Sequence, residues 1–164
     1  IIRMNVKIRK ATTQDYNPLL ELFDLLDALH RDNLPSILQK PHGPARDQRY
    51  FHLLLSDEDT ALNIAEIENE IVGFILALAR DTPPIPVFIP SHFIMVTDIA
   101  VKKEFRRKGI GLLLVNEVHK WAKNRGASSV ELNVYAFNQA AIDFYKDVGY
   151  ETISLRMRFP LIQG

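Results

Sequence analysis

The sequence contains no cysteine at any of its 164 positions. This absence excludes a disulfide framework, a zinc site built from thiolates and a cysteine nucleophile. A net charge is also missing, because 20 basic residues offset 20 acidic ones. Nucleic-acid-binding domains usually carry a strong basic excess, so we expect no nucleic acid as a general partner.

Long apolar runs are missing as well. The most apolar stretch, 71–79, is too short to span a bilayer. No long apolar run follows residues 1–4, so we expect no signal peptide. We therefore expect no membrane partner and a cytoplasmic location, with which the lack of cysteine is compatible. Apolar residues still make up 47% of the chain, so we expect residues 1–164 to form a single domain with a substantial core.

Hydrophobic periodicity predicts a mixture of strands and helices. Strands are expected near 6–8, 62–67, 71–79, 93–101, 130–134 and 153–159, and helices over about 13–33, 47–55, 109–126 and 138–149. The strand at 71–79 is apolar on both faces and is expected to lie centrally in a sheet. Four prolines between Asp81 and Pro90 exclude a helix or an inner strand there. This order predicts a partly antiparallel sheet flanked by helices.

A glycine-containing basic turn connects the predicted strand 93–101 to the helix that follows it. Backbone N–H groups at a helix N-terminus lack intrahelical partners and attract phosphate groups. Gly109 and Gly111 let an anion approach the backbone closely, and Arg106, Arg107 and Lys108 add positive charge. The turn therefore predicts a phosphate site at the start of the helix.

Two common phosphate motifs do not fit this turn. No Gly-Lys-Ser/Thr follows it, which argues against a P-loop, and Leu114 stands where a dinucleotide fingerprint needs its third glycine. Taken alone, the turn is equally compatible with an ordinary surface turn that carries basic residues.

Two blocks of sequence resemble a known enzyme family. The run 98–111 places an Arg-x-x-Gly-x-Gly loop after a strand that ends in valine, which resembles motif A of the GNAT family of N-acetyltransferases. The stretch 133–150 carries Asn138 and a Tyr-x-x-x-Gly-Tyr ending, which resembles motif B of that family. The resemblance implies the α+β GNAT fold, a single mixed and mostly antiparallel sheet flanked by helices.

The resemblance also implies an activity. Members of this family transfer an acetyl group from acetyl-CoA, as cosubstrate, to a primary amine by direct attack in a ternary complex, without a metal. The partners implied are therefore acetyl-CoA and an amine acceptor, either a small molecule or a protein amine, and a homodimer is left open. The alternative is a non-catalytic acyl-CoA-binding sensor or interaction module on the same fold.

The resemblance implies a set of coenzyme-binding residues. They are Ile99, Val101, Arg106, Arg107, Lys108, Gly109, Ile110, Gly111, Leu112 and Asn138. The loop residues would hold the pyrophosphate through backbone N–H groups, and the strand residues would pair with the pantetheine arm. Ile99 and Val101 also read as plain core residues, and Asn138 reads equally well as a helix N-cap.

Two residues match positions that would move protons. Tyr145 matches the general acid that protonates the leaving thiolate, although a core aromatic is the alternative. Asp98 is the best placed general base, because a carboxylate on an otherwise apolar strand is suited to accept a proton when half buried. A structural carboxylate is the alternative there. Glu104 and His92 are weaker candidates, and His119 is assigned no chemistry.

The acceptor is expected near the end of the first helix and the irregular stretch that follows it. In this region charged and aromatic side chains are available for binding: His30, Arg31, His42, Arg46 and Tyr50. Each one singly also fits an exposed helix end or loop. The proline-rich loop 81–90 is read as a lid, a dimer contact or a simple connection.

Overall fold

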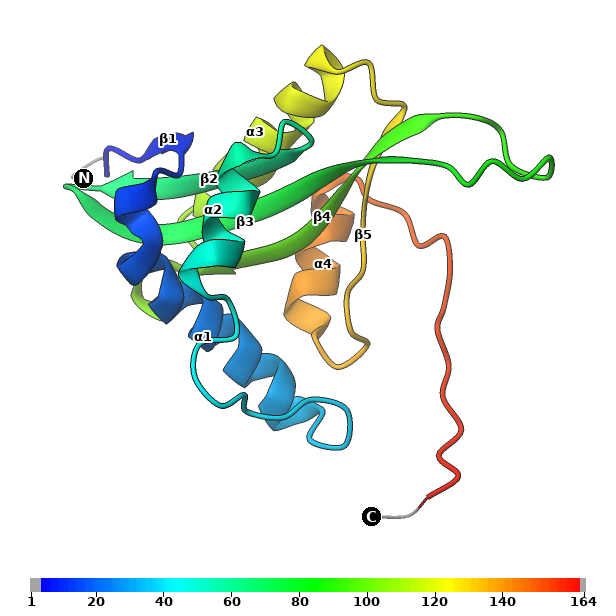
Figure 1. The fold of residues 1–164 in the computed structure, drawn as a ribbon, viewed down its shortest axis with the longest axis horizontal. Helices are drawn as coiled ribbons and strands as arrows, with labels where there is room; N and C mark the ends of the chain where they lie inside the picture. The colour runs from blue at the N-terminus through cyan, green and yellow to red at the C-terminus, as the bar shows by residue number, and fades with distance from the viewer. Residues whose placement is uncertain (1–3, 163–164) are drawn as a thin grey trace.

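A computed structural model describes residues 4–162 of the chain (Figure 1). The strands are β1 (Lys7–Lys10), β2 (Thr60–Ile67), β3 (Glu70–Asp81), β4 (His92–Val101) and β5 (Ser129–Leu132). The helices are α1 (Tyr16–Asn33), α2 (Gln48–Ser56), α3 (Ile110–Asn124) and α4 (Gln139–Val148), with single 3-10 turns η1 (Thr13–Asp15) and η2 (Lys103–Phe105). None of the helices within residues 4–162 has the length and apolar character to cross a membrane.

The strands form a mixed sheet in the order β1-β2-β3-β4-β5. The first three pairings are antiparallel, and β4 pairs with β5 in parallel. β3 occupies the centre, as its apolar character on both faces predicted, and seven successive residues of it, 71–77, are buried. The α+β fold class and the mostly antiparallel sheet are thus confirmed.

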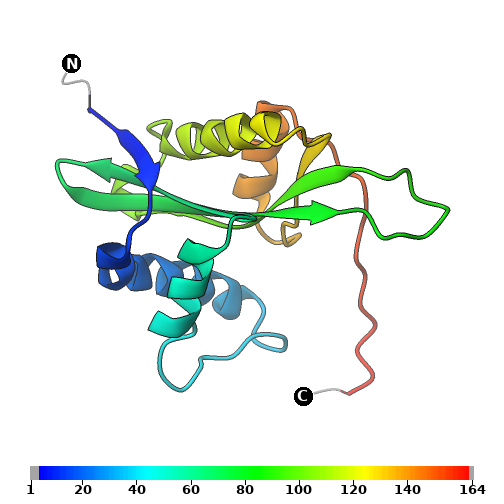
Figure 2. The ribbon, with the colours of Figure 1, turned by 45° about the horizontal axis from the view of Figure 1, so that its top comes forward.

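Helices cover both faces of this sheet (Figure 2). α1 and α2 lie on one face and bury Phe23, Phe51 and Phe74 among the residues of one core cluster. α3 and α4 lie on the other face, where Leu114, Val118 and Tyr145 belong to a second cluster. The sheet therefore separates two cores.

β4 changes its surroundings halfway along its length. Opposite β3, the register shifts between Leu76 and Ala77, which leaves Thr97 as an extra residue on β4. On the other side, β4 pairs with β5 only over 93–96, so the stretch 97–101 has no strand beside it there. A bulge of this kind bends a strand and re-aims its side chains, and here it lies next to Asp98.

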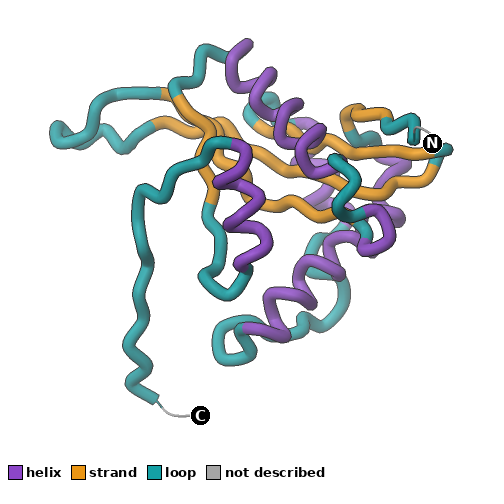
Figure 3. Tube along the Cα trace, turned by 180° about the vertical axis from the view of Figure 1, so that it is seen from behind, coloured by secondary structure: helices purple, strands orange, loops and turns teal. Residues whose placement is uncertain are grey.

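The strand expected at 153–159 does not form, and that prediction is wrong. The structure shows an extended segment after α4 that leaves the body of the molecule and pairs with none of the strands in the described chain (Figure 3). The alternation of apolar and polar residues in this segment is real, but alternation alone does not supply a neighbouring strand. Its apolar side chains are consequently exposed.

Candidate active site

The turn between β4 and α3 has the geometry of an anion site. η2 ends at Phe105, Arg107 takes a positive φ of 62°, and Gly109 follows with a φ of 83° as the N-cap of α3. The expected helix start near Gly109 is confirmed. A left-handed conformation is costly for residues with a Cβ, so glycine suits this position.

The backbone of this turn is free to bind a ligand. The N–H groups of residues 107–112 donate to no backbone carbonyl within the described chain. The space around Gly109 is open, because a Cβ built there would meet no atom within 4 Å. Arg106 is tied back to the strand by its Nε, which donates to the carbonyl of Val101 at 2.9 Å. Unsatisfied N–H groups at a helix N-terminus beside three cations favour a phosphate group.

The second half of β4, residues 97–101, has no strand partner on the β5 side and leads directly into this turn. Ile99 and Val101 pack their side chains against the core under α3 and α4. Ala100 packs against the core under α1 and α2, and Asp98 faces the same side because side chains alternate along a strand. The β4 backbone over 97–101 therefore presents peptide groups with no strand partner on the β5 side.

Asn138 and Tyr145 both lie on α4. The Oδ1 atom of Asn138 accepts from the N–H of Ala141 at 3.2 Å, so the asparagine caps the helix. The Tyr145 ring is buried in the core that Ile99 and Val101 line. Burial, and to a lesser extent nearby Tyr150, raise the pKa of Tyr145 above its usual value, so the phenol stays protonated at neutral pH.

The hydroxyl of Tyr145 nevertheless reaches an opening. No hydrogen-bond partner contacts it, yet no fully buried side-chain polar atom in the described chain lacks a partner. The oxygen is therefore open to solvent while the ring is buried. A protonated phenol in this position can donate to a group that enters from outside.

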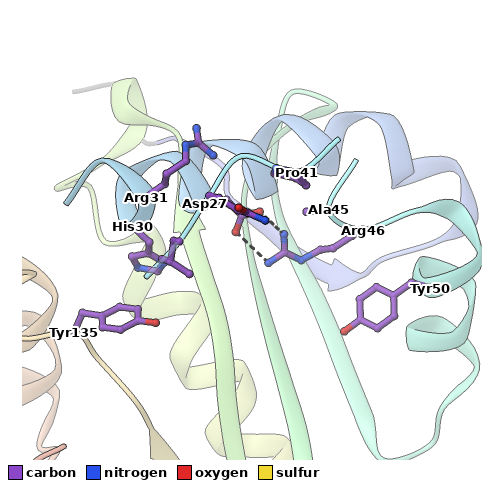
Figure 4. Close-up of a pocket in the computed structure, with 10 residues that line it drawn as sticks. Asp27, His30, Arg31, Pro41, Ala45, Arg46, Tyr50 and Tyr135 are labelled. Atoms are coloured by element: carbon purple, nitrogen blue, oxygen red, sulfur yellow. Dashed lines mark hydrogen bonds and ion pairs between the residues drawn. The ribbon is translucent and has the colours of Figure 1, made fainter. Parts of the chain in front are cut away.

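A pocket of about 450 Å³ lies on the opposite face of the sheet, beside α1 and the loop that precedes α2 (Figure 4). Its lining is mostly polar, charged and aromatic side chains with a few small apolar ones: Asp27, His30, Arg31, Leu38, Gln39, Pro41, Ala45, Arg46, Tyr50 and Tyr135. In Figure 4, Arg46 points toward Asp27 while His30 and Tyr135 face each other.

Arg46 connects this pocket to β4. Its guanidinium contacts Asp27 through two nitrogens, at 2.8 and 3.3 Å, and one of these also lies 3.3 Å from Oδ1 of Asp98. It also lies 4.7 Å from the centre of the Phe23 ring, and Tyr16 donates to the Arg46 carbonyl at 2.8 Å. Arg46 thus pairs with two carboxylates, and Arg31 adds a second positive charge to the lining, so these charges balance.

His30 provides an uncharged base in the same pocket. Its ring lies 5.2 Å from the Tyr135 ring and 6.0 Å from the Phe137 ring, both in edge-on contact. Burial lowers the pKa of His30, although the charges of Asp27 and Asp98 oppose the shift. The imidazole is therefore neutral at neutral pH.

A family profile described as "Acetyltransferase (GNAT) family" matches residues 21–150, which is 130 of the 164 residues. The chain belongs to the GNAT acetyltransferase family.

Curated GNAT relatives match the chain over part of their length. An uncharacterised N-acetyltransferase of Methanocaldococcus jannaschii, MJ1207, is 34% identical over 102 residues, 62% of this chain and 44% of that protein. The L-ornithine N5-acetyltransferase NATA1 of Arabidopsis thaliana is 33% identical over 108 residues, 65% of this chain and 46% of that protein. The chain thus covers less than half of either relative.

Solved structures agree over nearly the whole chain. A tetramutant of the BH1408 protein from Bacillus halodurans superposes with a TM-score of 0.88 at 26% identity, and the match covers 94% of this chain and 99% of that one. The aminoglycoside N-acetyltransferase AAC(6')-Iy, solved in complex with CoA, gives a TM-score of 0.75 at 17% identity, over 98% of this chain and 97% of that one. The second likeness concerns the fold alone.

Several residues singled out in the sequence lie away from the turn before α3 and from the pocket. His92 is exposed and pairs with Asp81 at the far end of β4, six residues or about 20 Å from Asp98. Glu104 is exposed in η2, and His42 does not line the pocket. His30, Arg31, Arg46 and Tyr50 do line it, as expected from the acceptor region.

Sequence reasoning missed two residues of the pocket and one residue on the opposite face of the sheet. Asp27 was read only as part of a helix and Tyr135 only as part of motif B, yet both line the pocket. His119, to which no chemistry was assigned, lies 2.8 Å from the hydroxyl of Tyr150, whose pKa is raised to about 12 by burial. Asp27 had a usable signal, because it lies one helical turn before His30.

Proposed function

We propose that this protein is an N-acetyltransferase that transfers the acetyl group of acetyl-CoA to a primary amine, with residues 1–164 forming one domain. The observation that carries the proposal is that three features lie next to one another: the open side of β4, the turn before α3 and the phenol of Tyr145. The stretch 97–101 of β4, which has no strand partner on the β5 side, runs into a turn with free N–H groups, and the phenol of Tyr145 lies in the core beside that stretch. Family membership and the CoA complex of AAC(6')-Iy support the same donor.

The residues fit the two chemically distinct parts of acetyl-CoA. The turn offers backbone donors, glycine and cations to a pyrophosphate, through Arg106, Arg107, Lys108, Gly109, Ile110, Gly111 and Leu112. The peptide groups around Ile99 and Val101 offer strand-like pairing to the two amides of the pantetheine arm. The Oδ1 atom of Asn138 is engaged in the helix cap, so Asn138 would contact the pantetheine arm through its side-chain NH2 group.

Two side chains would handle the protons of the reaction. When bound, acetyl-CoA supplies the thioester and therefore the leaving thiolate. Tyr145 holds a proton that it can donate to that sulfur. We assign acceptance of the proton of the amine to Asp98, directly or through water, because it lies at the point where the pocket meets β4.

The pocket beside α1 would hold the acceptor. Tyr50 and Tyr135 supply aromatic surface that can receive a cationic amine. A small primary amine fits, and the L-ornithine N5-acetyltransferase among the relatives supports that class. We further propose a cytoplasmic protein that works as a homodimer.

The donor half of the proposal is tested by thermal unfolding. Acetyl-CoA at about 100 times its Kd stabilises a protein by about 2.7 kcal/mol, which should raise the Tm by about 5 °C or more. ATP and NAD should not raise it. Equal stabilisation by ATP would contradict the coenzyme assignment.

The acetyl-transfer half is tested by thiol release from acetyl-CoA against amino acids, polyamines, aminoglycosides and peptides with free amines. Because the chain has no cysteine, every free thiol in the assay comes from CoA. Acceptor-dependent release is expected with at least one small amine. Binding of acetyl-CoA without release across the panel would instead support an acyl-CoA sensor.

A further inference from the structure

The carboxylate of Asp98 is held at both of its oxygens. Its Oδ1 atom lies 3.3 Å from a guanidinium nitrogen of Arg46, and its Oδ2 atom accepts a hydrogen bond from the hydroxyl of Thr97 at 3.0 Å. Within residues 4–162 no other hydrogen bond reaches this carboxylate. A carboxylate can accept about four hydrogen bonds, so both oxygens keep free acceptor capacity. With 20% of its side chain exposed, Asp98 is held in place and still open to a ligand.

Arg46, the partner of Oδ1, is itself fixed from several sides. Its guanidinium pairs with Asp27 through two nitrogens and lies over the ring of Phe23 (Figure 4). The hydroxyl of Tyr16 donates to the backbone carbonyl of Arg46. A planar guanidinium that makes a two-point contact and also stacks on a ring has little freedom to move. One oxygen of Asp98 therefore faces a rigid cation, although through a single long contact.

Thr97, the partner of Oδ2, owes its position to the bulge in β4. It is the extra residue where the register with β3 shifts between Leu76 and Ala77. Successive side chains of a regular strand point to opposite faces of the sheet, so neighbours such as Thr97 and Asp98 would not meet. Bulges re-aim side chains and are common beside active sites. The bulge here brings the two adjacent side chains into hydrogen-bond contact.

The hydroxyl of Thr97 has one hydrogen and two acceptors within reach. The carbonyl oxygen of Leu76 lies 3.4 Å away, and Oδ2 of Asp98 lies 3.0 Å away. A charged acceptor at the shorter distance forms the stronger hydrogen bond. The hydroxyl therefore acts on the carboxylate of Asp98 rather than on the backbone of the bulge.

We propose that Thr97 is a positioning residue that, together with Arg46, orients the carboxylate of Asp98 toward the incoming amine. The inference rests on the proposed function, in which Asp98 accepts the proton of that amine. Proton transfer needs the two heavy atoms within roughly 2.6–3.2 Å of each other, so a small rotation of the base lowers the rate. Because Arg46 contacts only one oxygen, loss of the Thr97 hydroxyl leaves the carboxylate free to rotate.

The first test removes the hydroxyl and keeps the shape of the side chain. Thr97→Val should lower kcat on a competent acceptor about tenfold, while the acceptor KM and the Kd of acetyl-CoA stay within about twofold of wild type. Thr97→Ser keeps the hydroxyl and should restore kcat to within about threefold of wild type. Thr60→Val is the matched control. The Thr60 hydroxyl donates to Asp57 at 2.7 Å, on a strand two positions from β4 in the sheet, so kcat should not change.

The second test is a double-mutant cycle that shows whether Thr97 acts through Asp98. In the Asp98→Asn background, Thr97→Val should change kcat by less than about twofold, because no base is left to orient. A further tenfold loss in that background would show that Thr97 acts independently of Asp98, and it would overturn the proposal.

Two results of the first test would also overturn the proposal. They are a wild-type kcat in Thr97→Val and a kcat of Thr97→Ser as low as that of Thr97→Val. Both contradict this inference alone and leave the proposed function standing. Failure of the wild type to acetylate any amine instead contradicts the proposed function and removes this inference with it.

Discussion

Tyr145 has a buried ring, while its oxygen is open to solvent and makes no hydrogen bond within the described chain. A tyrosine that only fills a core usually pairs its hydroxyl, so this oxygen is available to a group that enters from outside. Its pKa is raised, so the phenol is protonated at neutral pH, where it could donate a proton to the departing CoA thiolate. Both properties fit a proton donor that acts on a bound group.

Replacement of Tyr145 by Phe removes only this oxygen. We expect turnover on a competent acceptor to fall about 100-fold, as the loss of a general acid does, while the Kd of acetyl-CoA and the Tm change little. Steady-state kinetics and thermal unfolding measure both. Tyr150→Phe is the matched control, because it removes a neighbouring hydroxyl that already has a partner in His119. Wild-type turnover in Tyr145→Phe would remove this residue from the mechanism.

Asp98 and His30 are two candidate bases near the pocket, and their variants should behave differently. Asp98→Asn should lower turnover by about 100-fold or more. His30→Gln should act mainly on acceptor binding. Since the pKa of His30 lies below 6.5, its charge appears only as the pH falls below that value, where it would repel a cationic amine.

The measurement for His30 is the acceptor KM from pH 5 to 8. The ratio of wild-type to His30→Gln KM should be constant at neutral pH and rise toward the acidic end of this range. If His30→Gln instead loses turnover as severely as Asp98→Asn does, His30 is the base and the assignment of Asp98 is wrong.

The turn before α3 depends on backbone conformation more than on side chains. Gly109 and Gly126 stand at opposite ends of α3, with φ of 83° and 69°, and neither would meet an atom within 4 Å if it carried a Cβ. They therefore form a matched pair, in which the conformational strain is the same and only the proximity to the proposed phosphate site differs.

Gly109→Ala and Gly126→Ala should each destabilise the fold by about 1 kcal/mol, because alanine resists the left-handed conformation. Only Gly109→Ala should weaken acetyl-CoA binding, by about tenfold, since only there would strain or a Cβ disturb the free N–H groups. Calorimetric titration with acetyl-CoA, together with urea unfolding, measures both effects. Equal loss of affinity in the two variants would show that α3 transmits the change and that the turn is not the site.

In the whole molecule, the proposed donor site and the proposed acceptor pocket lie on opposite faces of the sheet. The turn, α3 and α4 lie on one face, and the pocket beside α1 lies on the other. β4 takes part in both, since Ile99 and Val101 face one core and Asp98 contacts Arg46 of the pocket. Its stretch 97–101, which has no strand partner on the β5 side, is therefore the place where donor and acceptor can meet.

The opposite edge of the sheet holds an ion cluster that affects the stability of the whole molecule. Arg9 on β1 contacts Asp15 at 2.8 Å and Glu66 on β2 at 2.8 Å. The hydrogen bond from Arg9 lowers the pKa of Asp15, with a smaller contribution from Thr12, although burial opposes the shift. Since the folded pKa lies below the unfolded one, this stabilisation is present above about pH 4 and is lost as the pH falls further.

Asp15→Asn should therefore lower the free energy of unfolding by about 1–3 kcal/mol at neutral pH. The difference from wild type should shrink as the pH falls below 4, because the wild type then loses the same charge. Urea unfolding at a series of pH values measures it. Asp24→Asn is the control, since Asp24 is exposed on α1 and belongs to none of the ion pairs of the described chain. A difference that stays constant down to pH 2 would contradict the role of the charge.

The sequence by itself determined the features that depend on neighbouring residues. Helical spacing and caps located α3 between Gly109 and Gly126, and the β-rich apolar runs located β3 and β4. The phosphate-binding turn also followed from the sequence, because glycine, basic residues and a helix start are adjacent along the chain.

Only the tertiary structure decided the contacts between distant parts of the chain. Arg46 and Asp98 are 52 residues apart, and no local pattern indicated that they would pair. The bulge at Thr97 depends on the register with β3, which periodicity does not fix. The segment 153–159 does not form a strand for the same reason. A strand needs a partner edge, and the sequence specifies only which side chains would share one face.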